Sequence, residues 1–137
     1  MNSSPFTVGI SHIGLSVSDL DASFKFFQVL GYNKIGGSES YPSIFIHDGT
    51  AMLTLWKTDE DYIPFNRRKN TGLHHLALKV PSIQALNDAY EAVSKVEGVR
   101  TTGEGAFGPQ KLEGTGLTHA MLYEPSGNRI ELTYHEA

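Results

Sequence analysis

Residues 75–90, HLALKVPSIQALNDAY, repeat the pattern of residues 12–27, HIGLSVSDLDASFKFF. Each stretch opens with a histidine and an alternating apolar segment, passes through a polar break and ends in an amphipathic segment with helical spacing. The break contains Asp19 in the first copy and Ser82 in the second, and both residue types cap helix N-termini through a side-chain oxygen. We interpret the two stretches as equivalent parts of a duplicated chain; the alternative is a chance likeness between two amphipathic units.

Short alternating runs follow each predicted helix and indicate strands joined by turns. Gly31 and Gly98 are suitable residues to end the helices, and Asp48-Gly49 and the PSGN segment 125–128 are suitable hairpin turns. Each half is therefore expected to be strand-helix-strand-strand-strand, which makes an α+β fold of two tandem βαβββ modules. The strands expected after the helices are 32–39, 43–48 and 51–57 in the first half, and 98–103, 117–124 and 128–135 in the second.

The length of 137 residues suits a single domain. We place module one at about 8–57, a linker at 58–71 and module two at about 72–135. The chain has no cysteine and a formal charge of −4, so we expect no sulfur-bound metal and no attraction to nucleic acid or anionic membrane. The N-terminus has neither the basic nor the apolar region of a signal peptide, and no apolar run is long enough to span a membrane. We expect a cytoplasmic protein.

The repeat aligns His75 with His12, and it aligns His74 with Ser11. Because neighbouring residues of a strand point to opposite faces, we expect His75 to face a site and His74 to face away. Glu131 lies between two apolar residues of the last strand, where it is either a solvated surface residue or a buried residue with partners. Two imidazoles and a carboxylate suit a divalent Fe, Mn, Ni, Co or Zn ion and leave positions free for substrate.

The segments ISHIGLSVSDL (10–20), LHHLALKV (73–80) and LYEPSGNRIEL (122–132) resemble those of the vicinal oxygen chelate superfamily. This superfamily includes glyoxalase I, the bleomycin- and fosfomycin-resistance proteins and the extradiol dioxygenases. The last segment is similar to the superfamily's Asp-Pro-x-Gly-x-x-x-Glu pattern, with Glu124 in place of the Asp. The resemblance covers residues from about 8 to 135.

The resemblance implies that the modules form an incomplete barrel-like mixed sheet with a metal cleft. It also implies that His12, His75 and Glu131 hold one divalent metal, which binds a small-molecule substrate through vicinal oxygens. A homodimer is expected, in which the site forms within one chain or between modules of two chains. The alternative implied function is a metal-free small-molecule binding or drug-sequestering protein of the bleomycin-resistance type.

The reaction type, lyase or isomerase against dioxygenase, stays open. Depending on the alignment, Leu53 or Thr54 stands where four-ligand members carry a further metal ligand, and neither residue is one. The remaining three-ligand set resembles that of the dioxygenases or the fosfomycin-resistance proteins. Met121 occupies the place of a tyrosine that assists the dioxygenase chemistry, and no histidine lies in the segment 111–118 before it.

Other residues are candidates to contact a substrate or assist catalysis. His119 and Tyr123 share a strand face with Met121, so each is a candidate acid-base or hydrogen-bonding group beside the metal; the alternative is simple packing. Thr54 and Met121 are further candidates near the substrate.

Two connecting segments are candidates to shape a pocket. The glycine-rich segment 103–116 is interpreted either as a mobile lid with Phe107 and Leu112 as apolar contacts, or as a flexible hairpin without a role. In the linker, Arg67 belongs to a basic triplet that either binds a substrate carboxylate or phosphate or is a solvated surface.

Overall fold

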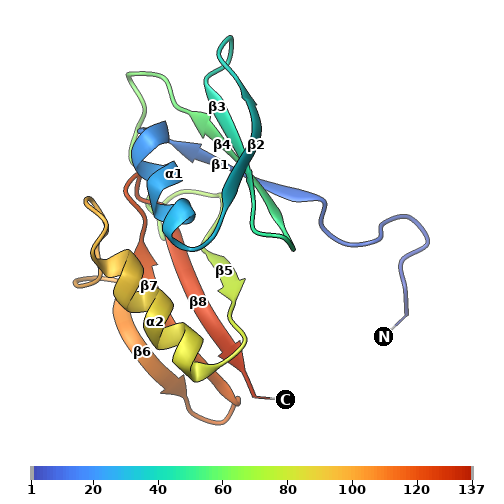
Figure 1. The fold of residues 1–137 in the computed structure, drawn as a ribbon, viewed down its shortest axis with the longest axis vertical. Coiled ribbons are helices and arrows are strands. Elements are labelled where there is room, and N and C mark those ends of the chain that lie inside the picture. Colours follow the sequence, from blue (N-terminus) through green and yellow to red (C-terminus); the bar gives the residue numbers. More distant parts are fainter. Residues whose placement is uncertain (1, 137) are drawn as a thin grey trace.

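The computed structural model describes residues 2–136, which form two tandem βαβββ modules (Figure 1), as the repeat predicts. Module one consists of β1 (His12–Val17), α1 (Leu20–Val29), β2 (Asn33–Ser38), β3 (Ser43–His47) and β4 (Met52–Lys57). Module two consists of β5 (Leu76–Lys79), α2 (Ile83–Ser94), β6 (Phe107–Leu112), β7 (Leu117–Tyr123) and β8 (Arg129–His135). The fold class is therefore α+β, and the two sheets remain open rather than closing into a barrel.

The helix boundaries follow the predicted capping chemistry. Asp19 and Ser82 are the N-caps of α1 and α2, and each side-chain oxygen accepts a hydrogen bond of 3.0 Å from the backbone N–H of the third helical residue. Gly31 and Gly98 follow the helix ends with φ of +104° and +89°. This left-handed conformation favours glycine, so Gly31 ends α1 as predicted, whereas Gly98 lies four residues beyond Ser94, the last residue of α2, in the turn that follows the helix.

The two sheets share one topology, in which the first strand of a module pairs in parallel with the last. The strand order is β1-β4-β3-β2 in module one and β5-β8-β7-β6 in module two. The parallel register pairs Gly14 with Thr54 and Ala77 with Glu131. Gly14 and Ala77 each follow a repeat histidine by two residues, so Thr54, and not Leu53, is the structural counterpart of Glu131.

The predicted strand at 98–103 is wrong. In this segment only Arg100 pairs with a strand, through one isolated bridge to Tyr123. Gly103 and Gly105 have φ of +85° and +77°, so the chain turns where the prediction required it to be extended.

The second strand of module two is instead β6, which lies inside the segment 103–116 that we interpreted as a lid loop or a flexible hairpin. β6 pairs antiparallel with β7 and forms the edge of the sheet. Its register shifts between Phe107 and Gln110, around Gly108 and Pro109, residue types that are rare in central strands but tolerated at an edge. These residues interrupt the alternation that would have revealed the strand in the sequence.

Both modules contribute to one apolar core, in which α1 and α2 lie along the same side of the molecule (Figure 1). The largest fully buried side chains include Phe26 and Phe27 of α1, Leu86 of α2, and Ile130 and Leu132 of β8. No helix within residues 2–136 combines the length and apolarity needed to cross a membrane.

A buried carboxylate connects the two modules. Glu124 is 1 % exposed, and it accepts hydrogen bonds from the Ser23 hydroxyl of α1 at 2.7 Å and from the backbone N–H of Ser126 and of Asn128. The Asn128 side-chain amide donates both to Glu124 and to the backbone carbonyl of Ser16 in β1. The residue that replaces the Asp of the superfamily pattern therefore fixes the turn before β8 against module one.

We expect Glu124→Ala to lower the free energy of unfolding by about 2–4 kcal/mol, because several buried donors lose their acceptor. Glu124→Gln keeps one oxygen and is expected to lose less. Urea unfolding monitored by circular dichroism measures both values. The matched control is Glu113→Gln, which alters an exposed carboxylate and should stay within about 0.5 kcal/mol of the parent. A Glu124→Ala protein as stable as that control would contradict a structural role for this carboxylate.

Candidate metal and substrate site

The candidate site lies on the face of the second sheet that is turned away from α2. Strand alternation directs Ile130 and Leu132 into the core and places Glu131 on the opposite face, where β7 contributes His119 and Met121. Glu131 is 7 % exposed and His119 is 8 % exposed. The sequence allowed Glu131 to be either a solvated surface residue or a buried residue with partners, and the structure shows that it is buried.

Two histidines bracket the Glu131 carboxylate. The Nε2 atom of His75 lies 3.1 Å from Oε1, and the Nδ1 atom of His119 lies 2.8 Å from Oε2. Because an ionised carboxylate only accepts hydrogen bonds, His119 must carry its proton on Nδ1. Its buried Nε2 atom and the buried hydroxyl of Thr133 make no hydrogen bond within residues 2–136. Both atoms are shielded from solvent in this structure.

His74 does not face away from His75, as strand alternation predicted. The Nδ1 atoms of the two rings lie 2.7 Å apart, which is hydrogen-bonding distance. The prediction fails because β5 begins at Leu76, so neither histidine is part of the regular strand. Loss of surrounding water lowers the pKa of His74, and the positive charges of His75, Arg129 and Arg67 lower it further. The neutral form of His74 can form a hydrogen bond with His75 and orient the His75 ring.

His12 lies in the other module and is exposed. Its Nδ1 atom is 3.1 Å from the hydroxyl of the neighbouring Ser11. In the described part of the chain, no three His, Cys, Asp or Glu side chains are placed to hold one metal ion. A single chain therefore brings His75 and Glu131 together but does not add His12 to them.

The equivalent position of module one has a different structure. Thr54 is 2 % exposed, and its hydroxyl accepts a hydrogen bond of 2.9 Å from the indole N–H of Trp56. A Cβ atom at Gly14 would lie 3.2 Å from this hydroxyl, so the glycine leaves room for it. Module one thus offers a hydroxyl where module two offers a carboxylate.

Other predicted residues line the same face of module two. The ring of Phe107 lies edge-on to that of His119, with 5.1 Å between centroids, and Met121 is buried opposite Glu131. The Tyr123 hydroxyl accepts a hydrogen bond of 2.8 Å from Arg67 of the linker. Leu112, the other predicted lid contact, is exposed.

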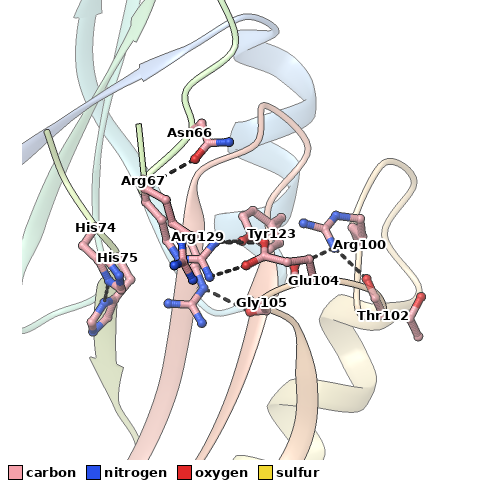
Figure 2. A network of polar contacts seen from close by, with 11 residues as sticks. Asn66, Arg67, His74, His75, Arg100, Thr102, Glu104, Gly105, Tyr123 and Arg129 are labelled. Carbon is pink, nitrogen blue, oxygen red and sulfur yellow. Dashed lines mark hydrogen bonds and ion pairs between the residues drawn. The ribbon is translucent and has the colours of Figure 1, made fainter. Parts of the chain in front are cut away.

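A group of charged residues around Tyr123 was not identified from the sequence (Figure 2). Arg67 binds the Glu104 carboxylate through two nitrogens at 2.7 and 3.0 Å, and these hydrogen bonds lower the pKa of Glu104. Arg100 lies over the Tyr123 ring, with its guanidinium carbon 4.0 Å from the centroid. Arg129 donates to the backbone carbonyl of residue 105. These residues come from three stretches of the chain, at positions 67, 100–105 and 123–129, so the sequence did not reveal the group.

Two cavities adjoin at this end of module two. One, of about 170 Å³, is lined by His74 and by the arginines around Tyr123. The other, of about 420 Å³, lies beneath the linker between the modules. Both are lined by Phe65, Leu73, Gly127 and Asn128. Neither cavity is lined by His75 or Glu131.

The model of the Glyoxalase/Bleomycin resistance protein/Dioxygenase superfamily matches residues 9–132. The chain belongs to this superfamily. Membership confirms the resemblance drawn from the sequence, and it agrees with the two βαβββ modules. Comparison of the sequence with curated proteins finds no significant match.

Solved structures of superfamily members have the same fold. A glyoxylase/bleomycin resistance protein/dioxygenase domain from Frankia sp. EAN1pec is 21% identical, with a TM-score of 0.78 over 95% of this chain and 93% of that one. FosX from Listeria monocytogenes, solved with Mn(II) and 1S,2S-dihydroxypropylphosphonic acid, is 20% identical, with a TM-score of 0.70 over 96% and 93%. A bleomycin-binding protein complexed with bleomycin is 20% identical, with a TM-score of 0.66 over 94% and 100%. Metal-binding and drug-binding proteins therefore both use this architecture.

We expect His119→Leu and Thr133→Val to change stability in opposite directions. The first removes the donor to a buried carboxylate oxygen and should destabilise the protein by about 2 kcal/mol. The second replaces an unpaired buried hydroxyl with a methyl group of similar shape and should stabilise it by about 1 kcal/mol. Urea unfolding of metal-free protein measures both. A Thr133→Val variant that loses stability would show that the hydroxyl has a partner in solution.

Proposed function

We propose that this superfamily member is a metal-dependent enzyme that acts on a small molecule with two neighbouring oxygens. The observation that carries the proposal is the pair formed by His75 Nε2 and Glu131 Oε1, 3.1 Å apart. Two donors bound to one ion at about 2.1 Å each, at a right angle, stand about 3.0 Å apart. The donor set thus fits a divalent Fe, Mn, Ni, Co or Zn ion. Such an ion, when bound, supplies a Lewis acid with open positions for substrate.

The metal site is proposed to be shared between two copies of the chain. His75 and Glu131 come from one copy, and His12 of a second copy is the third ligand. The exposure of His12 and its separation from the other two ligands support this arrangement. An extended N-terminal arm also projects from the body of the chain (Figure 1), with Phe6 92 % exposed and Ile10 81 % exposed. A second copy would bury these apolar side chains.

The remaining residues have distinct proposed roles around this centre. His119 holds one oxygen of Glu131 through its Nδ1–H and thereby aims the other oxygen, which is the role of a positioning residue. His74 orients the His75 ring through the bond between their Nδ1 atoms. The candidate contacts to substrate are Thr54, Phe107, Met121, Tyr123 and Arg67. The alternative function is that of a metal-free binding protein, for which the likeness to the bleomycin-binding protein is the supporting observation.

Metal analysis of untagged protein tests the enzyme proposal. We expect about one divalent ion per chain in the parent, and none in His75→Ala or Glu131→Ala. His119→Ala should bind the ion about 10–100-fold more weakly, because a ligand loses its supporting hydrogen bond. His135→Ala, which alters an exposed histidine, is the matched control and should keep the metal. A metal-free parent that binds a small molecule would favour the alternative.

Subunit mixing tests the sharing of the site. His12→Ala and Glu131→Ala proteins are each expected to be metal-free. In a mixed dimer one site has both defects, whereas the other combines His12 of one subunit with His75 and Glu131 of the other and is intact. Unfolding and refolding a mixture should therefore restore metal to about one site in four, since half of the dimers are mixed. If each site formed within one chain, the mixture would bind no metal.

A further inference from the structure

Three arginines from separate parts of the chain converge at the smaller cavity. Arg67 comes from the linker, Arg100 from the segment after α2, and Arg129 from the start of β8. Figure 2 shows the guanidinium groups of Arg67 and Arg129 gathered between the histidine pair and Tyr123. The cavity, of about 170 Å³, is smaller than the roughly 300–1,000 Å³ typical of a whole drug-sized ligand, and it suits a single charged group.

The positive charge of this cluster is only partly balanced. Glu104 forms an ion pair with Arg67, and among residues 2–136 no carboxylate forms one with Arg100 or Arg129. Arg129 uses its Nε–H on a backbone carbonyl, and Arg100 uses one nitrogen on two backbone carbonyls. Because guanidinium groups bind carboxylate and phosphate groups through paired N–H donors, the cluster retains capacity for an additional anion.

Among residues 2–136, Glu104 is the one carboxylate that pairs with the cluster, and its side chain is more exposed than that of its partner. The Arg67 side chain is 14 % exposed, whereas that of Glu104 is 67 % exposed. Arg67 is further fixed by its bond to the Tyr123 hydroxyl. Glu104 lies between Gly103 and Gly105, whose positive φ angles mark a tight turn that few other residues could form. Arg67 is therefore held in place, whereas the exposed Glu104 carboxylate can be displaced from it.

The cluster is placed to hold the far end of a molecule bound at the metal site. Arg129 precedes Glu131 by two residues on the same face of β8, a separation of about 7 Å along the strand. His74 lines the arginine cavity and is bonded to His75. A substrate that extends a few bonds beyond its two vicinal oxygens could therefore reach both the proposed metal site and the arginine cluster.

We propose that Arg67, Arg129 and Tyr123 bind a terminal oxyanion of the substrate, a carboxylate, phosphate or phosphonate, and that Glu104 occupies this position until the oxyanion displaces it. The identification of this anion with the substrate rests on the proposed function. Anion binding itself does not, because it needs no metal. Because Glu104 competes for Arg67, the apparent affinity for the oxyanion equals the intrinsic affinity multiplied by the fraction of time for which Arg67 is free. If that fraction is about one tenth, the apparent affinity is about tenfold lower than the intrinsic one.

Titration of metal-free protein with inorganic phosphate, followed by the NMR signals of the Glu104 and Gly105 amides, tests the proposal. We expect Glu104→Gln to bind phosphate about tenfold more tightly than the parent, because the competitor loses its charge. Two double variants, Arg67→Gln with Glu104→Gln and Arg129→Gln with Glu104→Gln, are then compared with the single Glu104→Gln variant. Each should bind phosphate at least tenfold more weakly than that single variant. Parallel titrations with methylphosphonate and acetate identify the preferred type of oxyanion.

The matched control is Glu60→Gln, which removes the same charge from an exposed ion pair with Lys57 in the linker region. This variant should bind phosphate like the parent. Equal phosphate binding by Glu104→Gln and Glu60→Gln would overturn the proposal and leave Glu104 as a structural latch. Since the titration uses protein without metal, that result would not affect the metal site, and a failure of metal binding would not affect the anion site.

Discussion

Parallel pairing between the first and last strands of each module is the constraint on which the candidate site depends. In module two this pairing aligns Ala77 with Glu131, so the histidine that precedes β5 meets the carboxylate of β8. In module one the same pairing aligns Gly14 with Thr54. The repeated topology therefore creates two equivalent positions in each chain, and the last strand places a hydroxyl at the one in module one and a carboxylate at the one in module two.

The difference between the modules has a physical basis in their neighbours. Glu131 is buried beside two imidazoles, with His119 Nδ1 at 2.8 Å from one carboxylate oxygen and His75 Nε2 at 3.1 Å from the other. Thr54 is equally buried, but its single hydroxyl is satisfied by the indole of Trp56. A carboxylate without such donors would be costly to bury. In each sheet, a polar residue is thus buried at the centre of the face turned away from the helix. The neighbouring side chains of each residue suit it: imidazoles beside the carboxylate, and an indole N–H beside the hydroxyl.

Much of the fold could be predicted because its determinants are local. Caps such as Asp19 and Ser82 and helix-ending glycines act within a few residues, and the repeat doubles the signal from each. The alignment of His12 with His75 came from the same repeat. The errors arose where local patterns are interrupted: Gly108 and Pro109 concealed β6, and the late start of β5 invalidated the expected orientation of His74.

The contacts missed by sequence reasoning are those between residues that are distant in the chain. Arg67 and Glu104 are 37 positions apart, and Ser23 and Glu124 are 101 apart. Glu124 was recognised only as a departure from the superfamily pattern, although it connects the modules. Arg129 lies inside the quoted segment 122–132 but was given no role there, and Arg100 has no motif around it; the folded chain brings both to Tyr123.

The hydrogen bonds around the buried Glu124 carboxylate also affect how the protein would behave in dilute solution. Ser126 and Asn128 fasten the turn before β8 to the backbone of module one, so the two modules of one chain are held at a fixed angle. Within residues 2–136, His12 does not join His75 and Glu131 in one metal-binding group. If a second chain completes the proposed site, dilution below the dimer dissociation constant would separate the ligands, and metal occupancy per chain would fall with protein concentration.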